Sequence, residues 1–314
     1  MDAVRGRDEG AVVIRLIALD VDGTLLDSRW QVPEANRRAL LAATERGIEV
    51  VLVTGRRFEF ARPVVDQLSG PFWLIVNNGA LVKTRDGETI IRHLLPAGIA
   101  RQALEATARF RDSAAVVFDR AGPRQVIYER LESSDPHRVV YFESNRASIG
   151  AVDPLEASLT EDPLQLMFTG TVAVMRDLLS VLRGLPYADQ FEVSVTEYEA
   201  RDFSLVDVTR QGCSKGATLA EWAARRGVSR EEIMAVGDNL NDRDMLEFAG
   251  VAVVMGNAVA ELRSAGWPIT LTNDECGVAE AIHRYALRQP LPKVSLPGSK
   301  PGGRPPAKKK KEGC

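Results

Sequence analysis

Cysteine and histidine are both scarce in this 314-residue chain, which has three of each. The cysteines Cys213, Cys276 and Cys314 are odd in number and widely spaced, and the histidines do not cluster. This pattern argues against a disulfide framework and against a zinc site made of cysteine or histidine. It is typical of proteins in a reducing compartment, so we expect a cytoplasmic location.

Long hydrophobic runs are also missing. No stretch approaches the roughly 18 uninterrupted apolar residues that a membrane span needs. The opening MDAVRGRDEG contains acids and no apolar segment, so it is unlike a secretory signal. Hydrophobic residues make up 45% and charged residues 26% of the chain, as in ordinary globular proteins. The sequence therefore predicts a globular protein, long enough for two domains, without a membrane partner.

A net positive charge is confined to one terminal segment. Residues 290–314 contain six Lys, one Arg and one Glu, so their net charge is +6. Because the whole chain has a net charge of −3, the rest of the chain has a net charge of −9. An acidic body argues against a nucleic-acid partner. The segment is rich in Pro, Gly and Lys, and we expect it to be flexible, with Lys308–Lys311 solvated.

Continuous apolar segments alternate with helical patterns between residues 12 and 81. Strands are expected at 11–19, 48–53 and 72–76, with helices near 34–46 and 57–68. The alternation returns after residue 206, with strands at 233–237, 251–255 and 269–272 and a last helix near 277–287. Buried strands separated by helices predict a doubly wound parallel sheet, an α/β fold.

The pattern changes between residues 82 and 206. A hairpin is expected around Asp86-Gly87, then a helix after Pro96, then short strands at 114–119, 125–129, 163–169, 191–198 and 203–209. We therefore expect a core made of 12–81 and 207–287, interrupted by an inserted α+β domain at 82–206. Residues 1–11 and 288–314 are expected to be flexible termini.

Polar residues follow several of the predicted core strands. Asp20 and Asp22 follow the first strand, Thr54 and Gly55 the second, and Asp238 the strand at 233–237. The carboxyl ends of parallel strands form the usual ligand site of such a sheet. Two acids so close together need a compensating cation, and carboxylate oxygens suit Mg²⁺ shared with a phosphate.

These residues form a recognisable series. DVDGTL at 20–25, TGR at 54–56, the lone Lys215 and GDNLND at 237–242 resemble the four motifs of the haloacid dehalogenase superfamily of phosphohydrolases. NNGA at 77–80 and MGNA at 255–258 resemble further signatures of its Cof-type branch. The long gap between the second and third motifs matches the position of a type IIB cap domain.

The resemblance implies a Mg²⁺-dependent phosphatase with an aspartyl-phosphate intermediate. Asp20 would be the nucleophile and Asp22 the general acid–base. The metal would be held by Asp20, Asp238, the backbone carbonyl of Asp22 and the Asn239 position, with Asp242 in support. The implied phosphate contacts are the Val21 amide, Thr54, Gly55, Lys215 and Asn241.

Other functions remain open on the sequence. A phosphomutase of the phosphomannomutase type would need the same Asp20–Asp22 pair, and a non-catalytic phosphate-binding protein would keep the phosphate contacts. The expected substrate is a small phosphorylated metabolite resembling a sugar phosphate, and the expected state is a monomer or homodimer. Glu143, Arg201 and Asp202 of the inserted domain are unranked candidates for choosing the substrate. Asp27 is expected to be a turn or helix-entry residue.

Overall fold

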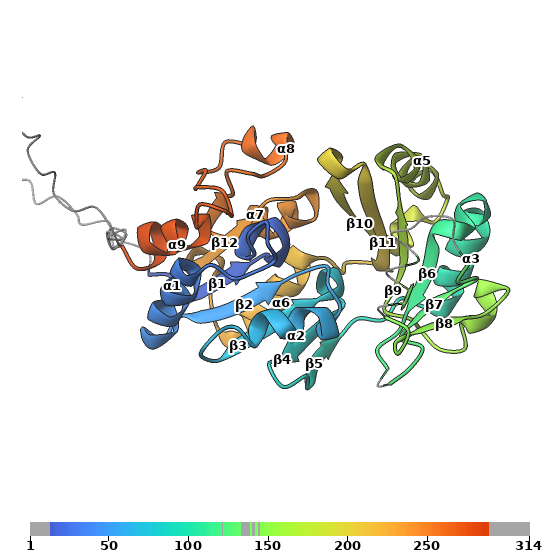
Figure 1. The fold of residues 1–314 in the computed structure, drawn as a ribbon, viewed down its shortest axis with the longest axis horizontal. Helices are drawn as coiled ribbons and strands as arrows, with labels where there is room; N and C mark the ends of the chain where they lie inside the picture. The colour runs from blue at the N-terminus through green and yellow to red at the C-terminus, as the bar shows by residue number, and fades with distance from the viewer. Residues whose placement is uncertain (1–12, 121, 133–138, 140–141, 144, 289–314) are drawn as a thin grey trace, which may run out of the picture.

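A computed structural model describes residues 13–120, 122–132, 139, 142–143 and 145–288. Two α/β units make up this part of the chain, each built on one sheet (Figure 1). The predictions made for residues 1–11 and 289–314 lie outside the described residues. No helix among those described is both long and apolar enough to cross a bilayer.

The first unit, the core, contains a seven-stranded sheet in the order β13-β12-β1-β2-β3-β4-β5. The first five strands in that order run parallel, and β4 and β5 are antiparallel to their neighbours. The strands are β1 (Leu16–Leu19), β2 (Glu49–Val53), β3 (Phe72–Val76), β4 (Leu81–Thr84), β5 (Thr89–Arg92), β12 (Ile233–Gly237) and β13 (Val251–Val254). The expected α/β fold with a parallel core sheet is confirmed.

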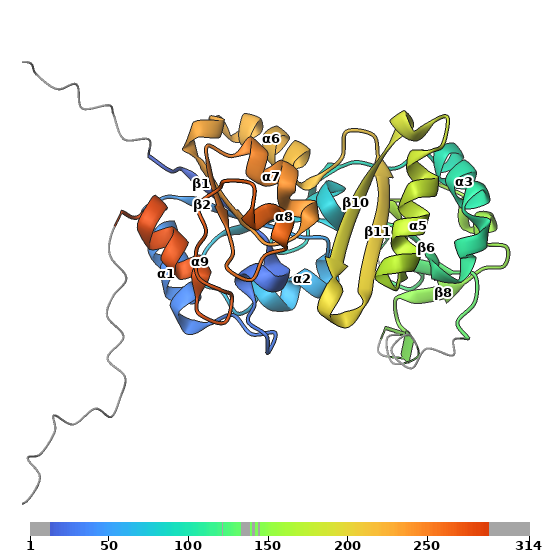
Figure 2. The same cartoon turned by 90° about the horizontal axis from the view of Figure 1, so that it is seen from above.

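Helices cover both faces of the core sheet (Figure 2). The core helices are α1 (Glu34–Glu45), α2 (Phe58–Val65), α6 (Lys215–Arg226), α7 (Arg243–Phe248), α8 (Ala260–Arg263) and α9 (Gly277–Ala281). Helix α1 packs with α9 on one face, and α6 packs with α7 on the other. Because both faces are covered, β1, β2 and β12 consist almost entirely of buried apolar residues.

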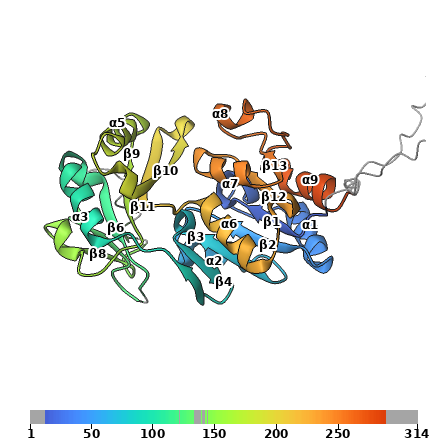
Figure 3. The same ribbon diagram turned by 180° about the vertical axis from the view of Figure 1, so that it is seen from behind.

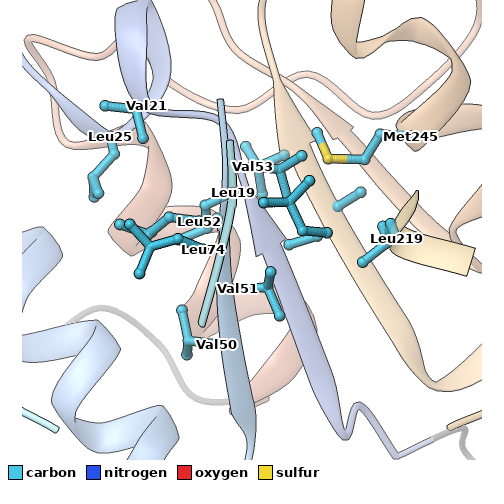
Figure 4. Close-up of a cluster of buried hydrophobic side chains, with 14 of the residues drawn as sticks. Leu19, Val21, Leu25, Val50, Val51, Leu52, Val53, Leu74, Leu219 and Met245 are labelled. Carbon is cyan, nitrogen blue, oxygen red and sulfur yellow. The ribbon is translucent and has the colours of Figure 1, made fainter. Parts of the chain in front are cut away.

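Leucine and valine side chains fill the space between the core strands and their helices (Figure 4). Leu19, Leu52 and Leu74 come from three neighbouring strands, and Leu219 and Met245 come from the helices of one face. All five are buried. This packing fixes the strand ends, and the polar residues that follow β1, β2 and β12 are held on that base.

The second unit, the cap, contains a six-stranded sheet in the order β10-β11-β9-β6-β7-β8. Its elements are α3 (Ala97–Ala106), β6 (Ala114–Val117), β7 (Val126–Tyr128), β8 (Ile149–Ala151), β9 (Gln165–Gly170), α5 (Val172–Arg183), β10 (Phe191–Tyr198) and β11 (Phe203–Arg210). The core lies on one side of this sheet, and α3 and α5 lie on the other (Figures 2 and 3). The cap has its own hydrophobic cluster, centred on Phe168 and Leu178.

The sheet pairing corrects two predicted boundaries of the inserted domain. The hairpin at 81–92 belongs to the core, because β4 pairs with β3 along the sheet edge. At the other end β11 continues pairing within the cap up to Arg210. Judged by strand pairing, the inserted domain therefore runs from about residue 93 to 210, rather than from 82 to 206.

One predicted strand is also wrong. Residues 269–272 form only a single bridge, between Ile269 and Val254, because the segment touches the sheet at one position. The short strand β8 was missed, since its three residues, Ile149 to Ala151, contain glycine and alanine and show no alternation.

Candidate active site

The ends of three adjacent parallel strands place the first polar residues of the site. Asp20 follows β1, Thr54 follows β2 and Asp238 follows β12. Leu19 pairs with Leu52 on one side and with Val236 on the other, so these three positions lie at the same edge of the sheet. The sequence prediction that they meet at the carboxyl end of the sheet agrees with this register.

Lys215 is buried between two acids at the start of α6. Its Nζ lies 2.6 Å from Asp20 Oδ1 and 2.5 Å from Asp242 Oδ1. Only 2% of Lys215 is exposed. Burial by itself would lower the pKa of Lys215, but the charges of Asp20 and Asp242 outweigh it and raise that pKa. Lys215 is therefore a fixed cation beside the predicted nucleophile.

Three carboxylates gather around this lysine. One oxygen from each of Asp20, Asp238 and Asp242 lies within 4.8 Å of the others, and all three residues are buried. Burial and then the charge of Asp242 raise the pKa of Asp20 to about 7, and burial with the charge of Asp20 raises the pKa of Asp238. The single positive charge of Lys215 does not balance the negative charge of three carboxylates, so a divalent cation would be electrostatically favoured at this cluster.

Backbone contacts hold the acids in place. The N–H groups of Asp238 and Asn239 donate to Asp242 Oδ2 at 2.9 and 3.0 Å, and Thr24 Oγ1 donates to Asp238 Oδ1 at 2.8 Å. Gly23 has φ +81°, and a Cβ there would lie 2.3 Å from Asp238 Oδ2. Glycine at this position is therefore required both by the backbone and by the closeness of the acid.

The side chain of Asp22 points to an arginine and is not part of the acid cluster. Arg56 donates from Nε to Asp22 Oδ2 at 2.8 Å and from Nη2 to Oδ1 at 2.6 Å. This two-bond pairing fixes the plane of the carboxylate. The predicted metal contact of Asp22 through its backbone carbonyl stays a prediction.

Three of the predicted phosphate contacts, Thr54, Gly55 and Asn241, lie beside a buried asparagine, Asn78, that the sequence left unassigned. Asn78 Oδ1 accepts from Asn241 Nδ2 at 3.0 Å, and the Asn78 side chain also packs against Gly55. Thr54 is fully buried, and its Oγ1 accepts from the N–H of Arg56 at 3.1 Å. The roles of these residues and of Val21, which is also buried, in phosphate binding stay predictions.

Asn78 connects this region to the cap. Its Nδ2 donates to Asp207 Oδ2 at 2.8 Å, and Gln165 Nε2 donates to Asp207 Oδ1 at 2.8 Å. Asp207 is buried in β11, and burial raises its pKa to about 7, although the bond from Asn78 opposes that rise. Sequence reasoning missed Asp207, although an acid within the apolar strand SLVDVT was an available signal.

Asn239 makes its contacts with the cap. Its Oδ1 accepts from the N–H of Glu197 at 3.2 Å and of Leu240 at 2.8 Å, and its Nδ2 donates to the Glu197 carbonyl at 2.9 Å. The predicted place of Asn239 beside a metal stays a prediction. The bonds to Glu197, in β10, were not foreseen, because nothing in a local motif indicates a partner 42 residues away.

Comparison with known proteins gives concordant results. The sequence profile of the haloacid dehalogenase-like hydrolases matches residues 17–282. Phosphatase YwpJ of Bacillus subtilis (strain 168) is 30% identical over 295 residues, covering 86% of this chain and 99% of its own. Pyridoxal phosphate phosphatase YbhA of Escherichia coli (strain K12) is 29% identical over 281 residues, covering 87% of this chain and 99% of its own.

Solved structures agree with this relationship. BT1666 from Bacteroides thetaiotaomicron, described among phosphatases of the haloalkanoate dehalogenase superfamily, has a TM-score of 0.73 and 26% identity. The match covers 91% of this chain and 100% of that one. With four motifs at one edge of the core sheet, a profile match over most of its length and phosphatases among its relatives, the chain belongs to the haloacid dehalogenase-like hydrolase family and is a Cof-type phosphatase.

Proposed function

We propose that this phosphatase hydrolyses phosphomonoesters of small metabolites in a Mg²⁺-dependent reaction that passes through a phosphoryl group bonded to Asp20. The observation that carries the proposal is the position of Asp20. It is 4% exposed at the end of β1, 2.6 Å from the ammonium group of Lys215 and clustered with Asp238 and Asp242. A carboxylate held beside a fixed cation is suited to attack an anionic phosphate.

The chemistry of the donor set supports Mg²⁺. Asp20 and Asp238 offer hard oxygen ligands, and the acid cluster contains no histidine or cysteine. When bound, Mg²⁺ would neutralise the charge between nucleophile and phosphate. The mutual repulsion that raises the pKa of Asp20 and Asp238 is a second reason why these residues would accept a cation.

In the proposed first step an oxygen of Asp20 attacks phosphorus, and the bond from phosphorus to the leaving oxygen breaks. Asp22 gives its proton to that oxygen, because an alkoxide is a poor leaving group. Lys215, fixed by Asp242, provides positive charge for the phosphate oxygens. In the structure Arg56 donates to both oxygens of the Asp22 carboxylate. Before this step one of these oxygens takes up the proton that Asp22 gives, and the other keeps its bond to Arg56.

In the proposed second step a water molecule attacks the phosphorus of the aspartyl phosphate. Asp22 takes the proton from that water, the bond between phosphorus and Asp20 breaks, and inorganic phosphate is released. Asp22 thereby returns to its protonated form and Asp20 to its carboxylate. Atoms and charges balance over the two steps, and the net reaction is hydrolysis of one phosphomonoester.

Relatives support a small metabolite as substrate. One acts on pyridoxal phosphate, and another, from Serratia proteamaculans (strain 568), is an HMP-PP phosphatase that is 30% identical over 250 residues. The phosphomutase alternative would return the phosphoryl group to a second hydroxyl of the sugar instead of giving it to water. Release of inorganic phosphate without a bisphosphate activator separates the two.

The test combines a metal and a mutation. We expect phosphate release from a panel of metabolites in Mg²⁺, its loss in excess chelator, and its recovery when Mg²⁺ is restored. Asp20→Asn should abolish turnover and the acid-trapped phosphoenzyme, while its far-UV circular dichroism spectrum should show that the variant is still folded. Asp86→Asn, an exposed acid in the β4–β5 turn, is the matched control and should keep full activity. Full turnover in chelator, or a labelled Asp20→Asn protein, would refute the proposal.

A further inference from the structure

A cluster of rings and arginines, which we call the ring cluster, bridges the core and the cap beside the catalytic acids. It consists of Trp30 and Arg56 from the core and Tyr198, Arg201 and Phe203 from the end of the β10–β11 hairpin. The guanidinium of Arg201 lies 5.7 Å from the ring centroid of Trp30 and 5.8 Å from that of Tyr198. Arg56 lies 5.6 Å from the Trp30 ring, and Phe203 stacks with Tyr198 at 6.4 Å and 18°.

The turn that carries Trp30 is firmly built. Asp27 Oδ1 accepts from the N–H groups of Arg29 and Gln31, each at 2.9 Å, and the N–H of Trp30 donates to the Asp27 carbonyl at 3.0 Å. The expectation that Asp27 is a turn residue is therefore confirmed. Trp30 itself has φ +62° and is 50% exposed. A bulky residue held in the left-handed region and left half in solvent is unfavourable for stability and points to a binding role.

The ring cluster adjoins the reacting groups. Arg56 contacts Trp30 with its guanidinium and binds Asp22 with the same group. On the cap side, Glu197, the residue before Tyr198, exchanges two backbone hydrogen bonds with the side chain of Asn239, which follows Asp238. The hairpin of β10 and β11 runs along the side of the cap that faces the core (Figure 2). The cluster therefore lies where the leaving group of a phosphate held at Asp20 would extend.

The two arginines differ in whether an acidic side chain already pairs with their charge. Arg56 is neutralised by Asp22. Within the described part of the chain, Arg201 has contacts to ring faces and no acidic partner. An exposed guanidinium held only by two rings can bind an anionic oxygen of a ligand while the rings stack on a planar group.

Resting on the proposed function, we propose that the ring cluster is the leaving-group subsite and selects phosphomonoesters whose leaving group is a planar heteroaromatic ring with an acidic oxygen. When the ligand binds, its ring takes the place of the Arg201 guanidinium against Trp30 and Tyr198, and Arg201 turns to bind the acidic oxygen. A puckered sugar presents no π-face and no acidic oxygen, so it packs less closely on the rings and gives Arg201 no anionic partner. This choice replaces the sugar-phosphate preference expected from the sequence with a different class of small metabolite.

The competing explanation is that the ring cluster is only a structural contact between cap and core, which we call a latch. Trp30 and Arg201 could hold the cap on the core without touching substrate, and their loss would then impair every substrate alike. The probes must therefore differ in the ring and share the ester. Pyridoxine 5′-phosphate and glucose 6-phosphate both carry a primary phosphate ester on a six-membered ring, which is planar with a phenolic oxygen in the first and puckered in the second.

Kinetics of both probes test the proposal. We expect wild-type kcat/KM for pyridoxine 5′-phosphate to exceed that for glucose 6-phosphate by at least about 10-fold. Trp30→Leu and Arg201→Gln should each lower the first value by about 10-fold and leave the second within about 2-fold, in line with stacking and cation–π energies. Arg109→Gln is the matched control, because Arg109 is an exposed cap arginine that also lies over a ring, that of Phe110. It should change neither value.

A binding measurement keeps the test independent of turnover. In an Asp20→Asn background, Trp30→Leu and Arg201→Gln should raise the Kd for pyridoxine 5′-phosphate about 10-fold and leave the Kd for glucose 6-phosphate unchanged. An equal loss on both probes identifies a latch and overturns the proposal, as does a wild-type preference for glucose 6-phosphate. If Asp20→Asn turns over as fast as wild type and still prefers pyridoxine 5′-phosphate to glucose 6-phosphate, the proposed mechanism is wrong and the proposed leaving-group subsite is supported.

Discussion

Lys215 illustrates how single residues divide the work of the site. Its ammonium group is bonded to Asp20 on one side and Asp242 on the other, and Asp242 in turn accepts the N–H groups of Asp238 and Asn239. Asp242 therefore connects the cation, the predicted metal carboxylate and the turn after β12. Removing either member of such a buried pair leaves the other charge uncompensated, which typically costs about 3–5 kcal/mol.

Asp22 gives the sharpest test at this scale. Asp22→Asn keeps the shape of the side chain but can neither donate nor accept the catalytic proton. An aryl phosphate has a good leaving group, so Asp20 should still attack it, while hydrolysis of the aspartyl phosphate should slow by about 100-fold or more. Rapid mixing with p-nitrophenyl phosphate should show a burst of nitrophenol followed by a stall, with label on Asp20.

The control for this experiment is Arg56→Lys. Lysine keeps the positive charge but cannot pair with both oxygens of Asp22 in one plane. It should lower steady-state turnover without trapping the phosphoenzyme, because the proton carrier is still present. Steady turnover of aryl and alkyl phosphates by Asp22→Asn would show that this carboxylate is only structural.

At the scale of elements, one link between cap and active site is the contact of β10 with the turn that contains Asn239. The backbone of Glu197 exchanges two hydrogen bonds with the Asn239 side chain. Glu197 also pairs with Arg176 of α5 at 2.8 Å, so the contact extends to a cap helix. A residue next to Asp238, the predicted metal carboxylate, is thus tied to the cap.

Asn239→Ala distinguishes the two roles of this residue. The two lost hydrogen bonds, at about 1 kcal/mol each, should raise the substrate KM by roughly 5- to 30-fold. The Mg²⁺ concentration for half-maximal activity should stay within about 2-fold, because the Asn239 oxygen is engaged by backbone N–H groups. Titrations of substrate and of Mg²⁺ measure the two effects. A tenfold shift in the Mg²⁺ titration at unchanged KM would instead support the metal role implied by the motif.

The same elements show what a sequence can predict. The alternation in FEVSVTEY predicts a strand at 191–198, and β10 has those bounds. The sequence also predicts the hairpin at 81–92, but it does not show which sheet the hairpin joins. Alternation reports only local conformation, and the partner of the hairpin is the edge of β3. The four motifs predict which residues gather at the strand ends. The contacts of Asp207 and Asn239 depend on how two sheets dock, which no local pattern contains.

At the scale of the whole molecule, buried polar contacts join the two sheets. Asp207 of the cap accepts from Asn78 of the core, which accepts from Asn241, so a chain of hydrogen bonds crosses the junction. Arg57 of the core also donates to Gln125 of the cap at 2.8 Å. The cap therefore rests on polar contacts that end at predicted phosphate-binding residues, which gives cap docking a direct effect on that region.

Asp207 makes this junction sensitive to pH. Its pKa is raised from 3.8 to about 7 in the folded protein, chiefly by burial. Between these two values the folded state binds a proton that the unfolded state does not, so the stability this provides is present at low pH and is lost as pH rises through about 7. Above that pH the folded protein keeps a buried carboxylate with two amide donors and no cation partner among the described residues.

Asp207→Asn should remove this pH dependence. The new amide can accept from Asn78 and donate to Gln165 Oε1, a buried oxygen that now lacks a partner. The free energy of unfolding of the variant relative to wild type should rise by about 2–3 kcal/mol between pH 5 and pH 7, at 1.36 kcal/mol for each pKa unit. Urea unfolding in chelator at four pH values measures the difference, and the raised pKa values of Asp20 and Asp238 cancel because both proteins share them. For Asp86→Asn the difference from wild type should not change with pH. A difference that is also constant for Asp207→Asn would mean that Asp207 is already ionised at pH 5, and a decrease with pH would likewise contradict the prediction.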